Sequence, residues 1–255
     1  MQQKLLYSWH RDEQGSDTVF SRFATPKGFK RQIVDDKSFG KWLRHLPLKK
    51  KNAMVKSFDG AVLMAPAAAV VDLDVGTKDL QQCADSILRL RAEFLKAERR
   101  ESEIAFHFTS GDLSSWTKWK RGYHPLVAGS KVTFVKRAKA DDSPAVFQSY
   151  LENLFLYAGT ASLAAYSKKR VYKALEPGDF FVLGGFPGHA VLVLDVARDQ
   201  KGETLFLLGQ GYMPAQSFHV VKNKKGEVWL GLDEKGELRI PTWPKPFLKS
   251  SLHRF

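Results

Sequence analysis

Residues 79–100 read DLQQCADSILRLRAEFLKAERR and carry the strongest helical pattern in the chain. Apolar side chains recur there at steps of three and four residues, at Leu80, Cys83, Ile87, Leu90, Phe94 and Ala97. Such spacing places side chains on one face of an α-helix. Asp79 followed by Gln82 resembles a capping box, so the helix is expected to begin at Asp79 or at Thr77. The stretch therefore predicts a long helix over about 79–100 with one face packed on the rest of the protein.

Short apolar and β-branched runs predict strands on both sides of this helix. The expected strands cover residues 69–75, 104–109, 131–137, 179–183, 189–197, 204–212 and 218–222, with shorter ones near 228–232 and 238–240. Residues 190–194 are apolar on both faces, which predicts a central, buried strand. Two further helical segments are expected, one containing Trp116 and Trp119 and one over about 144–167 that breaks near Gly159.

The order of these elements predicts the fold class. Strands and helices are segregated along the chain instead of alternating, which is typical of α+β proteins. We expect a central, mainly antiparallel sheet with the 79–100 helix packed on it. No internal repeat or linker is visible, so a single domain over 1–255 is predicted. It would include a poorly regular segment over about 1–50 and a helical insertion over about 110–170.

The chain is strongly basic, with 40 Lys and Arg against 27 Asp and Glu and a formal net charge of +13. Such an excess favours contact with polyanions such as nucleic acid, anionic lipid or an anionic cell wall. The basic residues are scattered, however, and no RNP-type, zinc-finger or helix-turn-helix pattern accompanies them. No specific nucleic-acid binding is therefore expected.

The sequence contains no candidate transmembrane segment, because its longest apolar stretch, 61–71, is short and interrupted by Pro66. The first residues lack the apolar core of a secretory signal. We therefore expect a cytoplasmic protein, or one of the cell envelope or periplasm if a signal has been removed. The sequence leaves the oligomeric state undetermined.

Cofactor motifs are absent from the sequence: there is no P-loop, dinucleotide fingerprint, zincin helix or C-x-x-C pair. The Gly-rich segment 184–188 joins two predicted strands, so it lacks the helix N-terminus that binds phosphate. The 7 His residues lie far apart in the sequence, which leaves a metal site assembled from distant strands only as an alternative. No cofactor and no metal is expected.

Cys83 is the only cysteine, and its position admits two interpretations. Near the start of the helix, the macrodipole favours the thiolate, which is the nucleophilic form. Cys83 also lies on the apolar stripe, and buried cysteines commonly act as small hydrophobic residues. Its position alone leaves both interpretations open.

His189 favours the catalytic interpretation, because it opens the central strand. A cysteine hydrolase needs a base from another element and a third group that orients the base. If residues 198–203 close a hairpin, the residue opposite His189 falls between Gln210 and Tyr212, and Gln210 becomes the candidate orienter. A one-residue slip would turn Gln210 to the other face. Asp195 lies roughly 20 Å along the strand and is too far away.

The predicted catalytic residues are thus Cys83, His189 and Gln210. The candidate substrate-binding residues are Gln82, Trp116, Trp119, Tyr212 and Gln216. Gln82 directly precedes Cys83 and would either donate to an oxyanion or only cap the helix. For the two tryptophans, core packing is the alternative, since they recur at helical spacing.

Several motifs of the chain resemble one known family. They are 79–94, Ser38–Leu48, Tyr157–Thr160 with Ser162–Leu163, Pro187–Val191 and Gly211–Gln216. Over about residues 23–255 the chain is similar to the bacterial domain-of-unknown-function family numbered 4846. The resemblance implies one intact domain, and it implies an envelope or lipoprotein signal, which members often carry.

The chain also resembles the papain-like NlpC/P60 and CHAP cysteine amidases. These run from a helix-borne cysteine, through a Gly-Asp-apolar strand, to a strand headed by His and then a polar residue. Pro177–Val182, His189 and Gln210 follow Cys83 in that order. The resemblance implies a papain-like arrangement, and the long interval between Cys83 and His189 implies an inserted subdomain.

Three functions are consistent with these patterns. The first is a papain-like cysteine hydrolase that cleaves an amide bond, for example in cell-wall peptide, with peptidoglycan or another anionic polymer as partner. The second is a non-catalytic envelope module that binds glycan or peptide in the same groove. The third is a basic polyanion-binding protein.

Overall fold

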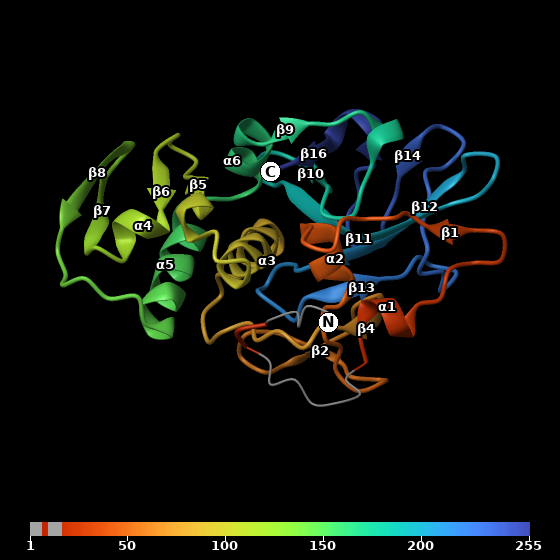
Figure 1. Ribbon diagram of the computed structural model, residues 1–255, viewed down its shortest axis with the longest axis horizontal. Helices are drawn as coiled ribbons and strands as arrows, with labels where there is room; N and C mark the ends of the chain where they lie inside the picture. The colour runs from red at the N-terminus through yellow and green to blue at the C-terminus, as the bar shows by residue number, and fades with distance from the viewer. Residues whose placement is uncertain (1–6, 10–16) are drawn as a thin grey trace.

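The computed structural model describes residues 7–9 and 17–255. Its largest element is an eight-stranded sheet in the order β4-β13-β12-β11-β10-β16-β9, with β1 paired to the end of β11 (Figure 1). These strands are β1 (Lys30–Arg31), β4 (Ala67–Val70), β9 (Lys168–Lys169), β10 (Phe180–Leu183), β11 (His189–Arg198), β12 (Thr204–Gln210), β13 (His219–Val221) and β16 (Leu252–Arg254). Every pairing in it is antiparallel, which confirms the predicted sheet type.

Helices and small hairpins surround the sheet. The α-helices are α1 (Val19–Arg22), α2 (Phe39–Arg44), α3 (Cys83–Ala97), α4 (Trp116–Trp119), α5 (Pro144–Tyr157) and α6 (Thr160–Tyr166). The two-stranded sheets pair β2 (Val55–Lys56) with β3 (Val62–Leu63), β5 (Ala105–His107) with β6 (Leu113–Ser115), β7 (Tyr123–Ala128) with β8 (Lys131–Lys136), and β14 (Glu237–Leu238) with β15 (Phe247–Leu248). Short 3-10 turns cover Glu101–Glu103, Tyr172–Ala174 and Lys249–Ser251. The molecule is therefore a mixed α/β protein, and none of the helices described for it is long and apolar enough to span a membrane.

β11 lies inside the sheet and is buried on both faces. Ala190 and Leu192 face one apolar cluster, to which α2 and α3 contribute. Val191 and Val193 face a second cluster that contains Phe247. This alternation is that of a strand with apolar contacts on both sides. The predicted central, buried strand over 190–194 is confirmed.

α3 is shorter than predicted and begins later. The helix runs over Cys83–Ala97, 15 residues, and not over 79–100. The predicted capping box was wrong because the Asp79 carboxylate is bound elsewhere: Ala215 N donates to it at 2.6 Å and Gln82 Nε2 at 3.0 Å. Gln82 is the N-cap residue, and its backbone N–H donates to the Asp85 carboxylate. Cys83 is consequently the first residue of the helix.

α3 lies between the main sheet and a group of smaller elements formed by residues 105–157 (Figure 1). That group holds two hairpins in addition to α4 and α5. α5 ends at Tyr157 and α6 begins at Thr160, so the break predicted near Gly159 is confirmed. The strand predicted over 228–232 is wrong, since only an isolated bridge joins Leu230 to Phe206 there.

A buried carboxylate ties the N-terminal elements to β11. The Asp195 side chain, fully buried, accepts from Arg31 Nε on β1 and from Arg44 Nε on α2, both at 2.6 Å. Two charge-assisted bonds satisfy both carboxylate oxygens. Asp195 therefore has a structural role in holding β1 and α2 against the sheet.

Candidate functional site

Cys83 begins α3 with its sulfur beside the start of β11. Backbone N–H groups of Cys83, Ala84 and Ala190 point to the sulfur and favour its thiolate. Burial acts the other way and, together with the nearby Asp85 charge, raises the pKa of the thiol to about 11. The side chain is only 6% exposed. Cys83 is thus a protonated thiol at neutral pH, surrounded by donors that stabilise negative charge.

Asp85 lies in the first turn of α3 and is buried. One carboxylate oxygen accepts from Gln82 N at 3.1 Å, and the other has no hydrogen-bond partner among the described residues. Burial raises the pKa of this carboxyl to about 8. Asp85 is therefore largely protonated at pH 7 and adds little negative charge beside Cys83.

His189 is the first residue of β11, and its ring is fully buried. Its Nε2 lies 2.9 Å from Gln210 Oε1. The ring stacks on Trp243 and meets the edge of Tyr212, both with centroids 5.1 Å away. Burial lowers the pKa of His189 to about 4, so the imidazole is neutral at pH 7. Its Nδ1 is buried and accepts no hydrogen bond from any described residue.

The hydrogen bonds around Gln210 fix which nitrogen of His189 carries the proton. His219 Nδ1 lies 2.9 Å from the carbonyl oxygen of Ser217, which can only accept, so Nδ1 carries the hydrogen. His219 is neutral, because burial lowers its pKa to about 4, and its Nε2 is therefore an acceptor. Gln210 Nε2 donates to that atom at 3.1 Å and turns Oε1 toward His189. His189 then donates from Nε2 and keeps a lone pair on Nδ1.

The two halves of the site meet at the start of β11. Ala190, whose amide faces the sulfur, directly follows His189. Cys83 and His189 approach from opposite faces of the sheet. Ala190 faces the apolar cluster to which α3 contributes, whereas the His189 ring stacks on Trp243. No hydrogen bond joins the sulfur to the ring within the described ranges 7–9 and 17–255. Tyr212 lies beside both groups, because it contacts the ring and its pKa is raised by burial and by the Cys83 charge.

Cys83 lines a cavity of about 350 Å³. Its walls are the start of α3, the junction of α5 and α6, the loop before β11, and Met213. Three large apolar side chains at this cavity are exposed to solvent: Phe186 (84%), Leu156 (58%) and Met213 (41%). No Lys or Arg is among the described lining residues, although the chain is strongly basic. The cavity therefore suits an uncharged or apolar group next to the thiol.

The predicted substrate-binding residues are placed unequally around this cavity. Gln82 lines it, but its amide donates to Asp79. Trp119 lines an adjacent cavity of about 430 Å³ whose walls share Leu156 with the first. Trp116 does not reach either one, because it is fully buried and donates to Glu101.

Tyr212 and Gln216 also differ in position. The Tyr212 hydroxyl donates to the carbonyl of Thr242 at 2.7 Å, which fixes the ring against His189. Gln216 is buried and forms a backbone bridge with Ser57, outside the walls of both cavities.

Sequence reasoning missed the groups behind Gln210. His219 and Thr242 both bond its amide, at 3.1 Å from Nε2. His219 lies on β13, which pairs with β12 so that Gln210 and His219 are direct partners. Pairing of the predicted strands 204–212 and 218–222 was the signal that could have found it. Within the described residues, no three His, Cys, Asp or Glu side chains gather as metal ligands.

Comparison with known proteins yields one match, to the family described as domain of unknown function (4846), over residues 19–254. The chain belongs to this family. The description of the 4846 family names no activity. The reaction must therefore be inferred from the geometry of the site. No curated protein and no solved structure matches the chain. The likeness to the NlpC/P60 and CHAP amidases therefore gains no support from the comparisons.

Proposed function

We propose that this member of the 4846 family is a cysteine hydrolase that cleaves an amide bond, with Cys83 as nucleophile, His189 as base and Gln210 as orienter. One observation carries the proposal. The bond between His189 Nε2 and Gln210 Oε1 leaves the Nδ1 lone pair unused, at the start of the strand whose Ala190 amide faces the Cys83 sulfur. A nucleophile, an oriented base and backbone donors are the parts that acyl transfer requires.

The resting pair is neutral, so the mechanism begins with general-base catalysis. As the sulfur attacks the substrate carbonyl, His189 Nδ1 would take the thiol proton at the end of β11, where the two side chains come from opposite faces of the sheet. The Gln210 carbonyl would stabilise the resulting imidazolium through Nε2–H. The backbone N–H groups of Cys83 and Ala84 would donate to the oxyanion. When the C–N bond breaks, Nδ1–H protonates the leaving amine, and Cys83 holds a thioester. Water then attacks the thioester and gives a proton to Nδ1. As the C–S bond breaks, the acid is released and Nδ1–H returns that proton to the sulfur, which restores the thiol and the neutral imidazole.

The cavity indicates the class of acyl group. Its exposed rim residues Phe186, Leu156 and Met213 are apolar, and Lys and Arg are absent from its described walls. An uncharged peptide side chain or acyl chain would bury apolar surface there at roughly 25 cal/mol per Å². A carboxylate next to the scissile bond would find no cation in that part of the described wall.

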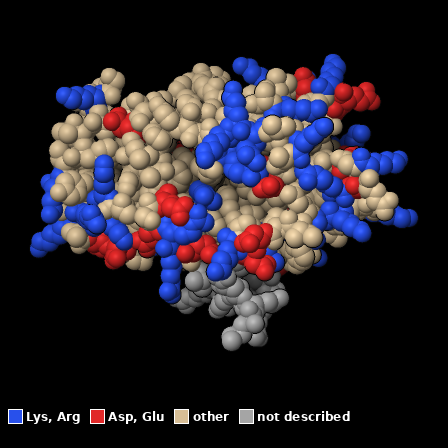
Figure 2. All heavy atoms as spheres, turned by 45° about the horizontal axis from the view of Figure 1, so that its top comes forward, with Lys and Arg blue, Asp and Glu red and all other residues tan. Residues whose placement is uncertain are grey.

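The proposal also specifies a papain-like arrangement of the catalytic residues and a cell-wall peptide as substrate. The surface charge supports an anionic polymer as the carrier of the scissile amide. Lys and Arg side chains spread over much of the face in Figure 2, with Asp and Glu among them. Such a distribution favours loose, salt-sensitive association with a polyanion more than one defined docking patch.

Acyl-enzyme trapping tests the proposal. Cys83 is the only cysteine, so any thioester or thiol adduct reports on this site alone. The native protein would be incubated with N-acyl peptide p-nitroanilides of apolar acyl residues and with peptides from purified cell wall. We expect amine release and a mass increase on Cys83, both lost in Cys83→Ala and reduced by at least about 10²-fold in His189→Phe. Absence of turnover and of adduct with every substrate, in a folded native protein, would contradict the proposal.

A non-catalytic binding module is the second candidate. The observation that favours it is the buried thiol, whose pKa of about 11 keeps it protonated. Binding of wall glycan or peptide by Cys83→Ala with native affinity, together with no turnover by the native protein, would establish this second function. Loss of binding when Phe186→Ser opens the rim would locate it in the same cavity.

A further inference from the structure

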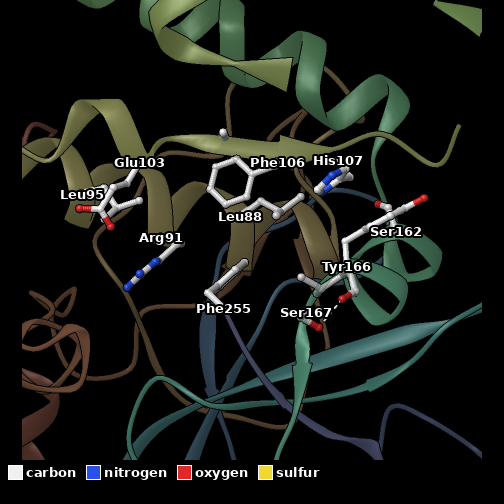
Figure 3. Close-up of a pocket in the computed structure, with 12 residues that line it drawn as sticks. Leu88, Arg91, Leu95, Glu103, Phe106, His107, Ser162, Tyr166, Ser167 and Phe255 are labelled. Atoms are coloured by element: carbon white, nitrogen blue, oxygen red, sulfur yellow. Dashed lines mark hydrogen bonds between the residues drawn. The ribbon is translucent and has the colours of Figure 1, made fainter. Parts of the chain in front are cut away.

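A separate cavity of about 230 Å³ lies between α3, β5, α6 and Phe255, and it shares no lining residue with the Cys83 cavity among the residues described. Phe106, Phe255 and Leu88 line it (Figure 3), and the two rings meet edge-to-face with their centroids 5.8 Å apart. Arg91, Leu95 and Glu103 lie at one end, and His107 and Tyr166 at the other. The hydrolase proposal assigns no role to this cavity.

Arg91 is half-buried and, unlike the buried Arg44 and Arg89, forms no ion pair with a carboxylate of the described residues, although the charge of Glu103 is near enough to oppose the lowering of its pKa by burial. Arg44 is bound by Asp195 at 2.6 Å, and Arg89 by Asp74 at 2.7 Å. Arg91 forms no hydrogen bond or ion pair with any residue that the structure describes. Glu103 also lines the cavity, but its two carboxylate oxygens are taken by Arg100 at 2.7 and 2.6 Å.

Aromatic rings hold the Arg91 guanidinium and leave its donors open. Its central carbon lies 5.3 Å from the ring centroids of Phe39 and Phe94 and 5.6 Å from that of Phe255. Ring faces stabilise the cation but accept none of its N–H groups in the geometry of a carboxylate. The guanidinium nitrogens lack partners among the described residues and still reach solvent. Burial lowers the pKa of Arg91 to about 10, so it remains a cation at pH 7.

The rest of the cavity has an apolar and a polar side. Leu88, Leu95, Phe106, Leu163 and Phe255 form the apolar side, while Ser162 and Ser167 add hydroxyl groups to the wall. An apolar cavity of about 150 Å³ is enough to bind benzene, so the larger space here accepts a ring and a short chain. A planar, always charged guanidinium prefers a carboxylate, which it binds through two parallel hydrogen bonds.

We propose that this cavity binds a small carboxylate with an apolar tail of about one aromatic ring, the carboxylate on Arg91 and the tail against the apolar wall that Leu88, Phe106 and Phe255 form. The bound anion supplies the acceptors that Arg91 lacks, and the tail removes apolar wall from water. The stacked pair His107 and Tyr166, with centroids 4.0 Å apart, lies at the far end of the cavity, where a longer tail would meet it.

Calorimetric titration with 3-phenylpropanoate tests the proposal, with 3-phenylpropan-1-ol and acetate as probes of tail and head alone. We expect the native protein to bind the acid at least about 10-fold more tightly than the alcohol or acetate. Arg91→Gln should weaken binding of the acid by about 10- to 100-fold and leave the alcohol unchanged. Ala105→Leu, which fills the cavity from β5, should weaken both ring-containing probes.

Arg121→Gln is the matched control, because it removes one exposed arginine and the same net charge. It should bind the acid like the native protein. Arg91→Gln removes a desolvated charge with no carboxylate partner among the described residues, so its Tm should not fall. If it unfolds nonetheless, the side-chain Nε–H resonance of Arg91 in the native protein carries the test, since the acid should shift it and the alcohol should not. Equal affinity for acid and alcohol, equal losses in Arg91→Gln and Arg121→Gln, or an unshifted Arg91 resonance would each overturn the proposal.

Discussion

His189 Nε2 lies 2.9 Å from Gln210 Oε1, and both side chains are fully buried. The contact joins the first residue of β11 to the last residue of β12. Because Gln210 presents its carbonyl oxygen, the imidazole donates from Nε2 and Nδ1 is the free base. The orientation of one amide thus decides whether His189 can accept a proton from a thiol.

Gln210→Leu should impair catalysis more than it impairs folding. We expect kcat/KM on any amide substrate of the protein to fall by about 10²-fold or more, because the imidazolium loses its acceptor and the ring its fixed orientation. The unpaired Nε2–H should also lower the free energy of unfolding by about 1–3 kcal/mol. Steady-state kinetics and urea denaturation measure the two effects. Gln148→Leu on α5 is the control, and equal kinetic losses in both variants would contradict the role of Gln210.

His219→Phe should change the protonation pattern of His189 without touching its ring. Without the Nε2 acceptor of His219, the Gln210 amide loses one of the partners that fix its orientation, although Thr242 still bonds it. We expect ¹⁵N spectra of the native protein to show His189 protonated on Nε2 alone, and those of the variant to show a mixture of tautomers. An unchanged His189 tautomer in folded His219→Phe would show that Thr242 suffices to orient the amide.

The sequence predicted the sheet better than the start of α3, and the reason is the range of the contacts involved. β11 and β12 are joined by a short loop, and their alternating apolar runs are visible locally. Asp79 is removed from the helix by the amide of Ala215, which is distant in the sequence. No local pattern reveals that contact, so Asp79 was predicted to cap the helix. The N-cap residue is Gln82 instead, and Asp85 binds its backbone N–H.

The site was predictable in part for the same reason. Hairpin geometry brought Gln210 near His189, even though an extra residue of β11 between Val193 and Asp195 shifts the register by one. Periodicity on the single turn of α4 could not tell which tryptophan lines a cavity: both are buried in the core, and only Trp119 lines one. Pairing the predicted strands 204–212 and 218–222 would have brought His219 near Gln210, but the irregular segment between β12 and β13 leaves the register of that pairing open in the sequence.

Stability should fall as the pH falls from about 6.5 to about 4. His189 and His219 have folded-state pKa values of about 4, below the ordinary value of 6.5. Between these values the unfolded chain binds protons that the folded protein excludes, so each histidine costs about 1–2 kcal/mol by pH 5. Thermal melts of the native protein and of His219→Phe measure this, and the variant should show a smaller loss of Tm between pH 7 and 5. If the Tm of both proteins falls by the same amount between pH 7 and 5, the pKa of His219 in the folded protein is close to the ordinary 6.5.

Asp195→Ala should be among the most destabilising single changes in the chain. It leaves Arg31 and Arg44 without the carboxylate that both bind at 2.6 Å, with the Arg44 side chain only 6% exposed. Removing one partner of a buried ionic cluster costs about 3–5 kcal/mol. Urea denaturation measures the loss, and the exposed Asp142→Ala should change stability by less than about 0.5 kcal/mol. A loss below about 1 kcal/mol for Asp195→Ala would show that water replaces the carboxylate.

Asp85→Asn should stabilise the protein at alkaline pH and make Cys83 more reactive there. The folded-state pKa of Asp85 is about 8, above the ordinary 3.8, so its contribution to stability is lost as the pH rises from about 4 through 8. The asparagine side chain of the variant stays neutral and can still accept from Gln82 N, so the gain in unfolding free energy should grow over that window and reach about 1 kcal/mol or more at pH 9. The ionised carboxylate also raises the pKa of Cys83, and its removal should speed alkylation by iodoacetamide above pH 8. Melts and alkylation rates at pH 5 and pH 9 are the measurements, with pH 5 as the internal control because the side chain at this position is neutral there in both folded proteins. If Asp85→Asn gains the same unfolding free energy over the native protein at pH 5 and at pH 9, Asp85 is already ionised in the folded protein at pH 5.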